Sequence, residues 1–452
     1  MITTIADLPP EVLVKILEYV SFSDIEKHCM NVCKLWETLI ASHFLVPKLQ
    51  VFGLLDVDLK KHLLSNGWND ENGSLEAKSS NPEFILETWK KFEPYRTKIL
   101  IAGGNATTVI DGKTIVHAEL IDLLDPSQSS LLDGFVSGTK GCFGGIINDQ
   151  IVLVTGKDSK LECSEIRSPK NRCSIFPSYD PMNPEKVNFN GVVVDQSILI
   201  MGGDNDKYYL KRFESKVIAS NGDCFEIRDG GPNLGFGLSR FGVVRYNENS
   251  IYLIGGDWRF PGIGSYDWHT NRTWIANLTL NTVQDGPEMN QGRCDHAYGK
   301  MIIGGKVLIV VAGGLCAKGN YKELDSVELL DPLSEQGWIE GPKMPFVLRG
   351  ASMVTSPCGK GVIVFGGFLP SKHRNPLFRD QLDGLPSSRI LEMRGDSIET
   401  LEWKVWDHKL RFSRHDHIAI PIPDKKNILE VLEQKKLVVN AKKKKFRPLQ
   451  LL

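Results

Sequence analysis

The feature that most constrains the fold of this chain is a hydrophobic run that ends in a glycine pair and recurs at nearly even intervals. One copy reads ILIMGGD at Ile198–Asp204, and a degenerate copy carries Thr155 in place of its first glycine. The last glycines of the copies stand at positions 104, 156, 203, 256, 314 and 367, which gives spacings of 52, 47, 53, 58 and 53 residues. A period near fifty built on a short buried strand is typical of propeller blades.

The sequence around each glycine pair is also repetitive. Further strand patterns precede the later pairs, at residues 186–194, 241–246, 296–303 and 350–355. Two more strands are expected after each pair, the last of them ending in a turn at Gly231, Gly286 or Gly341. The first unit lacks a leading strand, and an unused one remains at residues 416–422. We therefore predict an all-β propeller of six four-stranded blades over residues 95–424, closed by the C-terminal strand, which removes open sheet edges.

The overall composition indicates an intracellular protein. A chain of 452 residues is too long for one ordinary domain unless repeats carry most of it, and a net charge of −1 argues against a bulk nucleic-acid binder. The nine cysteines are scattered and include no CxxC pair, which favours reduced thiols. With no signal peptide or bilayer-length apolar run, we expect a cytoplasmic or nuclear location and no membrane partner, cofactor or metal.

Residues 7–46 are predicted to form three short helices. Asp7 is placed to cap the first, and Val12, Leu13, Ile16, Leu17 and Val20 form one apolar stripe along it. Ser23 and Glu26 form a capping box for the second helix. About forty residues without a disulfide or metal bury little apolar surface on their own. Part of this surface is therefore expected to meet a partner, although packing against the rest of the chain is the alternative.

This N-terminal segment, residues 1–50, resembles the F-box. Leu8-Pro9-Pro10-Glu11 matches the opening Leu-Pro-x-Glu, and Val32-Cys33-Lys34-x-Trp36 matches the later Val-Cys-(Arg/Lys)-x-Trp. The resemblance implies docking on the Skp-type adaptor of a cullin ubiquitin ligase. The implied adaptor contacts are Leu8, Pro9, Ile16, Leu17, Ile25, Val32, Cys33, Trp36 and Leu39.

Two segments lie outside the helices and the repeats. Residues 51–94 are predicted to be a helical linker with a polar, turn-forming middle, and a disordered tether is the alternative. Residues 425–452 form a basic tail, with eight Lys and one Arg against two Glu. A solvated end or a nuclear-import patch are its two interpretations.

The repeats resemble the kelch family, whose marks are the paired glycine after a hydrophobic strand and a later tryptophan. Trp338 and Trp403 are assigned to the fifth and sixth units, and Trp274 to the fourth. The second unit departs from the pattern, which leaves room for an irregular blade. The glycines are interpreted as structural positions of close backbone approach.

The predicted ligand-binding face follows from the topology of an antiparallel meander. The loop after each glycine pair lies at the same sheet edge as the entry to each leading strand. Aromatic and arginine side chains in these loops suit a binding patch. Arg240, Arg293, Arg349 and Arg414, called the entry arginines, are predicted to occupy matching positions at the entries to the leading strands. Hydrogen bonding between blades is the alternative role for these four residues. The candidate substrate contacts are Tyr208, Tyr209, Arg240, Trp258, Arg259, Phe260, Arg293, Arg349, Phe368 and Arg414.

No catalytic motif is found. His415-Asp416-His417 overlaps the closing strand, where alternate residues face opposite ways, so packing is favoured over metal binding. The two resemblances imply a non-catalytic subunit, the substrate receptor of a Skp–cullin–F-box ubiquitin ligase acting in ubiquitin-dependent proteolysis. An acidic or phosphorylated recognition segment is the hypothesis for its target. The alternatives are a kelch scaffold, such as a cytoskeletal binding protein, and a propeller hydrolase or oxidase.

Overall fold

The structure is a computed structural model. It describes helical residues 13, 17, 36, 39 and 40 and much of 97–423, with gaps at 107–108, 111–112, 115–116, 124–125, 127–128, 133–141, 158–159, 166–171, 175–187, 204–215, 222–223, 260–265, 268, 317–321, 358 and 371–383. The linker and the basic tail therefore lie outside the described residues. Within the described part, no helix combines the length and apolar character needed to cross a membrane.

The described N-terminal residues are helical and buried. Leu13 and Leu17, one turn apart, are 0% and 1% exposed, and Trp36, Leu39 and Ile40 are 6%, 8% and 0% exposed. The burial of Leu13 and Leu17 agrees with the apolar stripe predicted for the first helix from its spacing.

The rest of the described chain is built of strands, and its larger sheets are six four-stranded antiparallel sheets. Sheet 1 has the order β35-β1-β5-β6, with bounds Ile418–Pro423, Thr97–Ala102, Ala118–Asp122 and Ser130–Leu132. Sheet 2 contains β7 (Cys142–Ile147), β8 (Gln150–Lys157), β9 (Lys160–Glu165) and β10 (Arg172–Ser174). Sheet 3 contains β11 (Asn190–Val194), β12 (Ser197–Met201), β13 (Lys216–Asn221) and β14 (Cys224–Asp229).

The last three sheets repeat the same order. Sheet 4 contains β16 (Gly242–Arg245), β17 (Ser250–Ile254), β20 (Thr273–Asn277) and β21 (Thr282–Asp285). Sheet 5 contains β22 (Ala297–Ile303), β23 (Lys306–Ala312), β26 (Val327–Leu330) and β27 (Trp338–Glu340). Sheet 6 contains β28 (Ser352–Thr355), β29 (Gly361–Phe365), β32 (Ile390–Arg394) and β33 (Glu402–Val405).

Smaller sheets extend these units. One has three strands, β15 (Gly237–Ser239), β18 (Asp257–Arg259) and β19 (Tyr266–Asp267). The others are pairs: β2 (Asn105–Ala106) with β34 (Arg414–His415), β3 (Val109–Ile110) with β4 (Lys113–Thr114), β24 (Leu315–Cys316) with β25 (Lys322–Glu323), and β30 (Phe368–Pro370) with β31 (Gly384–Pro386).

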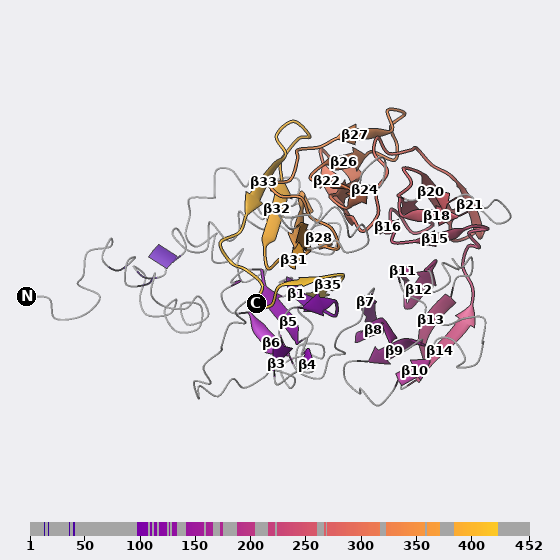
Figure 1. Ribbon diagram of the computed structural model, residues 1–452, viewed down its shortest axis with the longest axis horizontal. Coiled ribbons are helices and arrows are strands. Elements are labelled where there is room, and N and C mark those ends of the chain that lie inside the picture. The colour runs from indigo at the N-terminus through magenta and orange to yellow at the C-terminus, as the bar shows by residue number, and fades with distance from the viewer. Residues whose placement is uncertain are drawn as a thin grey trace, which may run out of the picture.

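The first strands of the six large sheets lie next to one another. Strand β7 contacts β11, β11 contacts β16, β16 contacts β22, β22 contacts β28, β28 contacts β35, and β35 contacts β7. Figure 1 shows the sheets arranged around a common centre, with these strands nearest to it. Apolar side chains fill the space between neighbouring sheets, as where Val310 and Leu329 of sheet 5 join Val364 and Leu391 of sheet 6 in one cluster.

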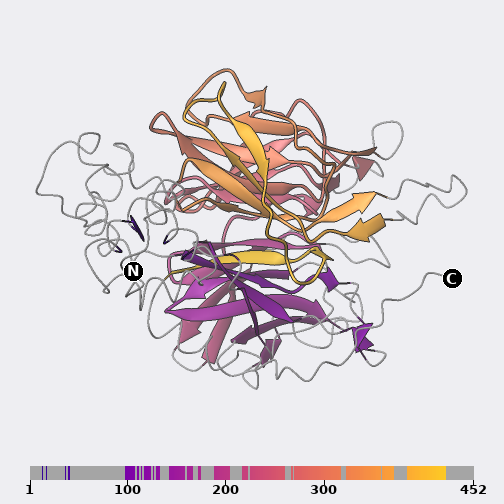
Figure 2. The ribbon, with the colours of Figure 1, turned by 90° about the vertical axis from the view of Figure 1, so that its left-hand side faces the viewer.

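The predicted pairing of the C-terminal strand with the strand before the first glycine pair is confirmed. Strand β35 pairs with β1 from Thr97 opposite Pro423 to Ala102 opposite Ile418. In Figure 2 the yellow C-terminal strand lies among the purple strands of the first sheet. Residues about three hundred positions apart in the sequence thus form one sheet, and β1 gains a partner on its otherwise open edge.

The glycine pairs end their strands for a steric reason. Gly255 and Gly256 have φ angles of +60° and +90°, which β-carbons disfavour. A Cβ on Gly255 would lie 2.5 Å from the carbonyl oxygen of Arg293 in the next sheet. One on Gly256 would lie 2.5 Å from that of Ser239. In the degenerate copy with Thr155, β8 instead continues to Lys157 and pairs with β9.

One tryptophan assignment is corrected. Trp338 begins β27, the fourth strand of sheet 5, and its indole N–H donates to the carbonyl of Pro287 in sheet 4's closing turn at 2.9 Å. Trp274 instead lies in β20, a third strand, where it is 3% exposed and stacks on Phe236. It is therefore not equivalent to Trp338, because the two strands lie at different distances from the centre.

Candidate functional site

One edge of the sheets brings together the two kinds of loop expected to form a binding face. Past the glycine pair of sheet 4, Asp257 pairs with Ser239, which precedes β16. Equivalent contacts join Cys294 to Leu315 and Arg349 to Phe368. The predicted proximity of glycine-pair loops and strand entries is confirmed in these units.

Five residues at this edge form what we call the entry ring. Asn188, Arg240, Asp295, Gly350 and Asp416 each stand two positions before the inner strand of their sheet. All five adopt left-handed backbone angles, with φ between 49° and 60°. The N–H of each of the last four donates to the carbonyl of the ring residue before it, over 2.7–3.1 Å. The ring thus ties five sheets together through the main chain.

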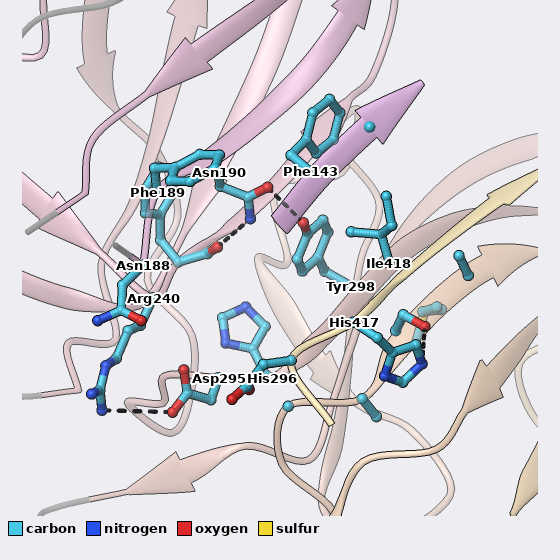
Figure 3. Close-up of a pocket in the computed structure, with 18 residues that line it drawn as sticks. Phe143, Asn188, Phe189, Asn190, Arg240, Asp295, His296, Tyr298, His417 and Ile418 are labelled. Carbon is cyan, nitrogen blue, oxygen red and sulfur yellow. Dashed lines mark hydrogen bonds and ion pairs between the residues drawn. The ribbon is translucent and has the colours of Figure 1, made fainter. Parts of the chain in front are cut away.

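A central cavity of about 230 Å³ lies inside the entry ring. Figure 3 shows Arg240 facing Asp295 at one side, and Asn190 hydrogen bonded to Tyr298 at another. Apolar walls alternate with these polar groups and come from the inner strands and their entries. The other lining residues are Phe143, Gly144, Asn188, Phe189, Phe241, His296, Gly350, Ala351, Ser352, Met353, Asp416, His417, Ile418 and Ala419.

Charges at the ring are arranged with opposite signs adjacent. Asp295 Oδ2 lies 3.7 Å from Arg240 and 3.9 Å from Arg349, so one carboxylate serves two guanidinium groups. Arg240 also lies 3.9 Å from the buried Asp257. Burial raises the pKa of Asp295 above its usual value, with the charge of Arg240 opposing that rise and Asp416 adding to it.

The second carboxylate of the ring is held by a neighbouring histidine. His415 Nδ1 lies 2.9 Å from Asp416 Oδ2. Burial acts to raise the pKa of Asp416, but the hydrogen bond and charge of His415 and the charge of Arg349 keep it below its usual value. The aromatic ring of Phe368 contacts both Arg349 and His415. The Arg349 guanidinium stacks over it at 4.5 Å, and the His415 imidazole meets it edge-on at 5.1 Å.

The four entry arginines are not equivalent, which corrects the alignment made from sequence. Arg240 stands two residues before β16, and Arg349 stands three before β28, whereas Arg293 and Arg414 stand four before β22 and β35. Arg293 and Arg414 are 0% exposed, so neither presents a surface to a ligand. A difference of one or two residues in the distance from the inner strand decides whether an arginine side chain lies at the mouth or in the interior, because successive side chains point in different directions.

Both buried arginines bond within the fold. Arg293 donates to the carbonyls of Gly313 and Ser326, to the Ser326 hydroxyl and to Glu328. Arg414 donates to the carbonyl of His117 at 2.8 Å and contacts that of Ile101 at 3.4 Å. Both arginines are therefore structural, but these bonds join each of them to residues of one sheet, Arg293 to sheet 5 and Arg414 to sheet 1, and not to a neighbouring sheet as the alternative expected.

The remaining substrate candidates are only partly described. Trp258 is half-buried, with Arg272 over its ring at 4.7 Å and Trp274 beside it at 6.5 Å. Phe368 is 9% exposed and packs against Arg349 and His415 at the entry ring. Arg259 lies in β18, and its side chain is not described. Tyr208, Tyr209 and Phe260 lie outside the described residues.

Among the adaptor candidates, Leu17, Trp36 and Leu39 are described, and all three are buried within the chain. Truncating any of them would therefore disturb packing as well as any partner contact. Leu8, Pro9, Ile16, Ile25, Val32 and Cys33 lie outside the described residues.

The cavity contains one pair that resembles a nucleophile and its base. Ser352 Oγ lies 2.8 Å from His417 Nε2. Burial, with the charge of Arg414, lowers the pKa of His417 to about 3, so the imidazole is a weak base. Its Nδ1 is buried without a hydrogen-bond partner, so no acidic group orients the ring. The pair lacks the third member and the basicity that hydroxyl activation requires.

Three buried side chains are the best described candidates for metal ligands. One donor atom each from Asp257, His269 and Cys294 lies within 4.8 Å of the others. Burial raises the pKa of Cys294 well above its usual value, with nearby Asp295 and Asp257 adding to the effect. A protonated thiol is a poor ligand, and the Arg240 guanidinium already supplies a positive charge beside Asp257. The cluster therefore suits a buried polar network better than a metal.

Most of the ring and cavity residues are not among the site residues predicted from sequence. Asp416 belongs only to the His415-Asp416-His417 motif considered for metal binding, and no sequence signal was assigned to Asn188, Tyr298 or Ser352. Each residue of the entry ring could be found from sequence as the one that stands two positions before the start of an inner strand. This requires the first residue of each strand to be predicted without error.

Comparisons with known proteins identify a domain in one part of the chain. An F-box-like family model matches residues 5–57, so the chain carries an F-box-like domain. No curated protein matches this sequence. One similar solved structure is titled "Structure of YjhT"; its TM-score is 0.48 at 12% identity, and the match covers 69% of this chain and 97% of that chain.

Proposed function

We propose that this protein is the substrate-recognition subunit of a Skp–cullin–F-box ubiquitin ligase and acts in the cytoplasm, the nucleus or both. The F-box-like domain at residues 5–57 is the observation that carries the proposal, since F-box domains dock on Skp-type adaptors. The protein is not itself an enzyme. It holds a target near the recruited conjugating enzyme and so raises the target's effective concentration there.

The strand-rich region is proposed to be a kelch-type propeller of six blades that binds the target. Six four-stranded meanders, the cyclic contacts of their inner strands and the pairing of β35 with β1 support this architecture. The main-chain bonds of the entry ring support it too. The target is proposed to bind at the entry ring, where Arg240 and Arg349 are the accessible members of the original arginine set.

The experiment that tests the adaptor assignment is co-purification of the full-length protein with the Skp-type adaptor and cullin. A Leu8→Ala/Pro9→Ala double variant is expected to lose both partners, because these residues match the F-box opening motif. Pro10→Ala is the matched control, since position ten is the variable member of that motif. Undiminished recovery of the adaptor by the double variant would refute the proposal.

The same variants identify targets. Proteins that accumulate on the Leu8/Pro9 variant but turn over with the native chain are the expected substrates. If the native protein captures partners without adaptor or cullin, the kelch scaffold becomes the better assignment.

A further inference from the structure

The central cavity is small for a cofactor or metabolite. Its volume of about 230 Å³ lies below the roughly 300–1,000 Å³ of common small-molecule sites. One side chain of a bound protein fits such a space better than a drug-sized ligand does. This reasoning rests on the proposed function, in which the ring face holds a target protein.

The charges around the cavity are already compensated. Arg240 and Arg349 share Asp295, and Asp416 stands beside them with its charge toward His415. A carboxylate or phosphate entering here would gain from the arginines but would also approach both aspartates. A cation would be attracted by the two aspartates but repelled by the two arginines. The described ring therefore favours neither sign strongly, in contrast to a cluster of unopposed arginines.

The interior offers neutral hydrogen-bonding groups. Asn190 and Tyr298 bond each other at 2.8 Å, as do Ser352 and His417. His296 lines the cavity at 4% exposure, and neither of its ring nitrogens has a hydrogen-bond partner. Burial, with the charge of Arg293, lowers the pKa of His296 to about 3, so at neutral pH its ring carries one donor and one acceptor.

We infer that the central cavity receives one uncharged, hydrogen-bonding side chain of the target, a carboxamide from Gln or Asn best of all. A carboxamide supplies a donor and an acceptor together, as the two unpartnered nitrogens of the neutral His296 imidazole require. A carboxamide is also uncharged, so it can lie between the arginines and aspartates of the entry ring without adding a charge to them. This replaces the hypothesis, made from sequence, of an acidic or phosphorylated recognition segment.

The test uses purified full-length protein, with and without its adaptor, and labelled short peptides as probes. Their flanking positions are randomised, and the central residue is fixed as Gln, Glu, phosphoserine or Lys. Fluorescence polarisation should show the Gln set binding about tenfold more tightly than the charged sets. A preference for Glu, phosphoserine or Lys, or no discrimination among the sets, would overturn the inference.

Two variants sharpen the result. Asp295→Asn leaves Arg240 and Arg349 without their shared carboxylate, so binding of the Glu set should rise to match or exceed the Gln set. Asp195→Asn is the matched control, because Asp195 pairs with Arg245 away from the cavity, and its selectivity should stay native. An unchanged Glu response in a folded Asp295→Asn protein would contradict the charge argument.

Failure of this inference is distinguishable from failure of the proposed function. Adaptor binding is measured on the same preparations, and it depends on the F-box-like domain. Loss of peptide selectivity with the adaptor bound sinks only the cavity inference, whereas absence of adaptor binding sinks only the ligase assignment.

Discussion

The indole N–H of Trp403 donates to the carbonyl oxygen of Pro342 across 2.8 Å, linking the fourth strand of sheet 6 to the closing turn of sheet 5. Trp338 makes the same bond to Pro287 one sheet earlier. The repeated tryptophan and the repeated Gly-Pro turn are therefore two halves of one link between neighbouring sheets. Tryptophan suits this role because its indole nitrogen is a donor only.

Replacing Trp403 by Phe should keep most of the apolar packing and remove this bond. The expected cost is about 1 kcal/mol in the free energy of unfolding, plus the carbonyl left unsatisfied. Trp338→Phe should lose a similar amount, because its partner is equivalent. Denaturant unfolding of the two variants provides the measurement, and native stability in both would show that the bond contributes nothing.

The buried pair of Arg293 and Glu328 should be sensitive to the loss of one partner. Both side chains are almost fully buried, at 0% and 2% exposure. Arg293→Met would leave the Glu328 charge buried and unpaired, at a cost of about 3–5 kcal/mol. Arg245→Met is the control, since Arg245 pairs with the 81% exposed Asp195 and should cost about 1 kcal/mol or less. Equal losses in thermal unfolding would contradict this contrast.

The buried histidines predict acid sensitivity. The pKa values of His296 and His417 fall to about 3 from an ordinary 6.5, chiefly through burial. Between these values the unfolded chain binds protons that the folded protein excludes. Their contribution is thus complete above pH 6.5 and is lost as the pH falls toward 3, by about 1.4 kcal/mol per pH unit for each histidine.

The variant that isolates this effect is His296→Phe, since Phe241 occupies the equivalent position in sheet 4. Its unfolding free energy, measured from pH 7 to pH 5, should fall less steeply than that of the native protein. Parallel pH profiles would rule out His296 as a source of the slope.

Two glycines with similar backbone angles should respond very differently to alanine. Gly366 and Gly304 have φ angles of +61° and +54°. A Cβ on Gly366 would lie 2.6 Å from the carbonyl of Arg414 and 2.7 Å from the ring of His417, whereas Gly304 has nothing within 4 Å.

Gly304→Ala should therefore cost only the backbone strain, about 1–2 kcal/mol. Gly366→Ala adds overpacking, for a total of about 2–5 kcal/mol. Unfolding free energies of the two variants give the comparison. Equal costs would mean that sheet 6 moves away from β35 without penalty.

Much of the fold was predictable because its signals are local. The period of the glycine pairs located all six large sheets, and the unused strand at residues 416–422 identified the partner of β1. Alternation of apolar residues and glycine turns acts within a few residues, so it can be read without tertiary contacts.

The site was harder to predict, and the arginines show why. Arg240 and Arg293 look alike in sequence, each close before an inner strand, yet one reaches the ring and the other is fully buried. Strand starts inferred from sequence carry errors of a residue or more, and one residue changes which way a side chain points.

The sequence by itself determined the repeat, the strand pairing that joins the two ends of the repeat region, and the F-box-like motif. Only the tertiary structure decided which charges meet at the entry ring, and that Asp295 occupies the space between Arg240 and Arg349. The physical reason is that periodicity is set by neighbours along the chain. Charge compensation depends on side chains from three different sheets, whose distances are fixed only when the sheets pack together.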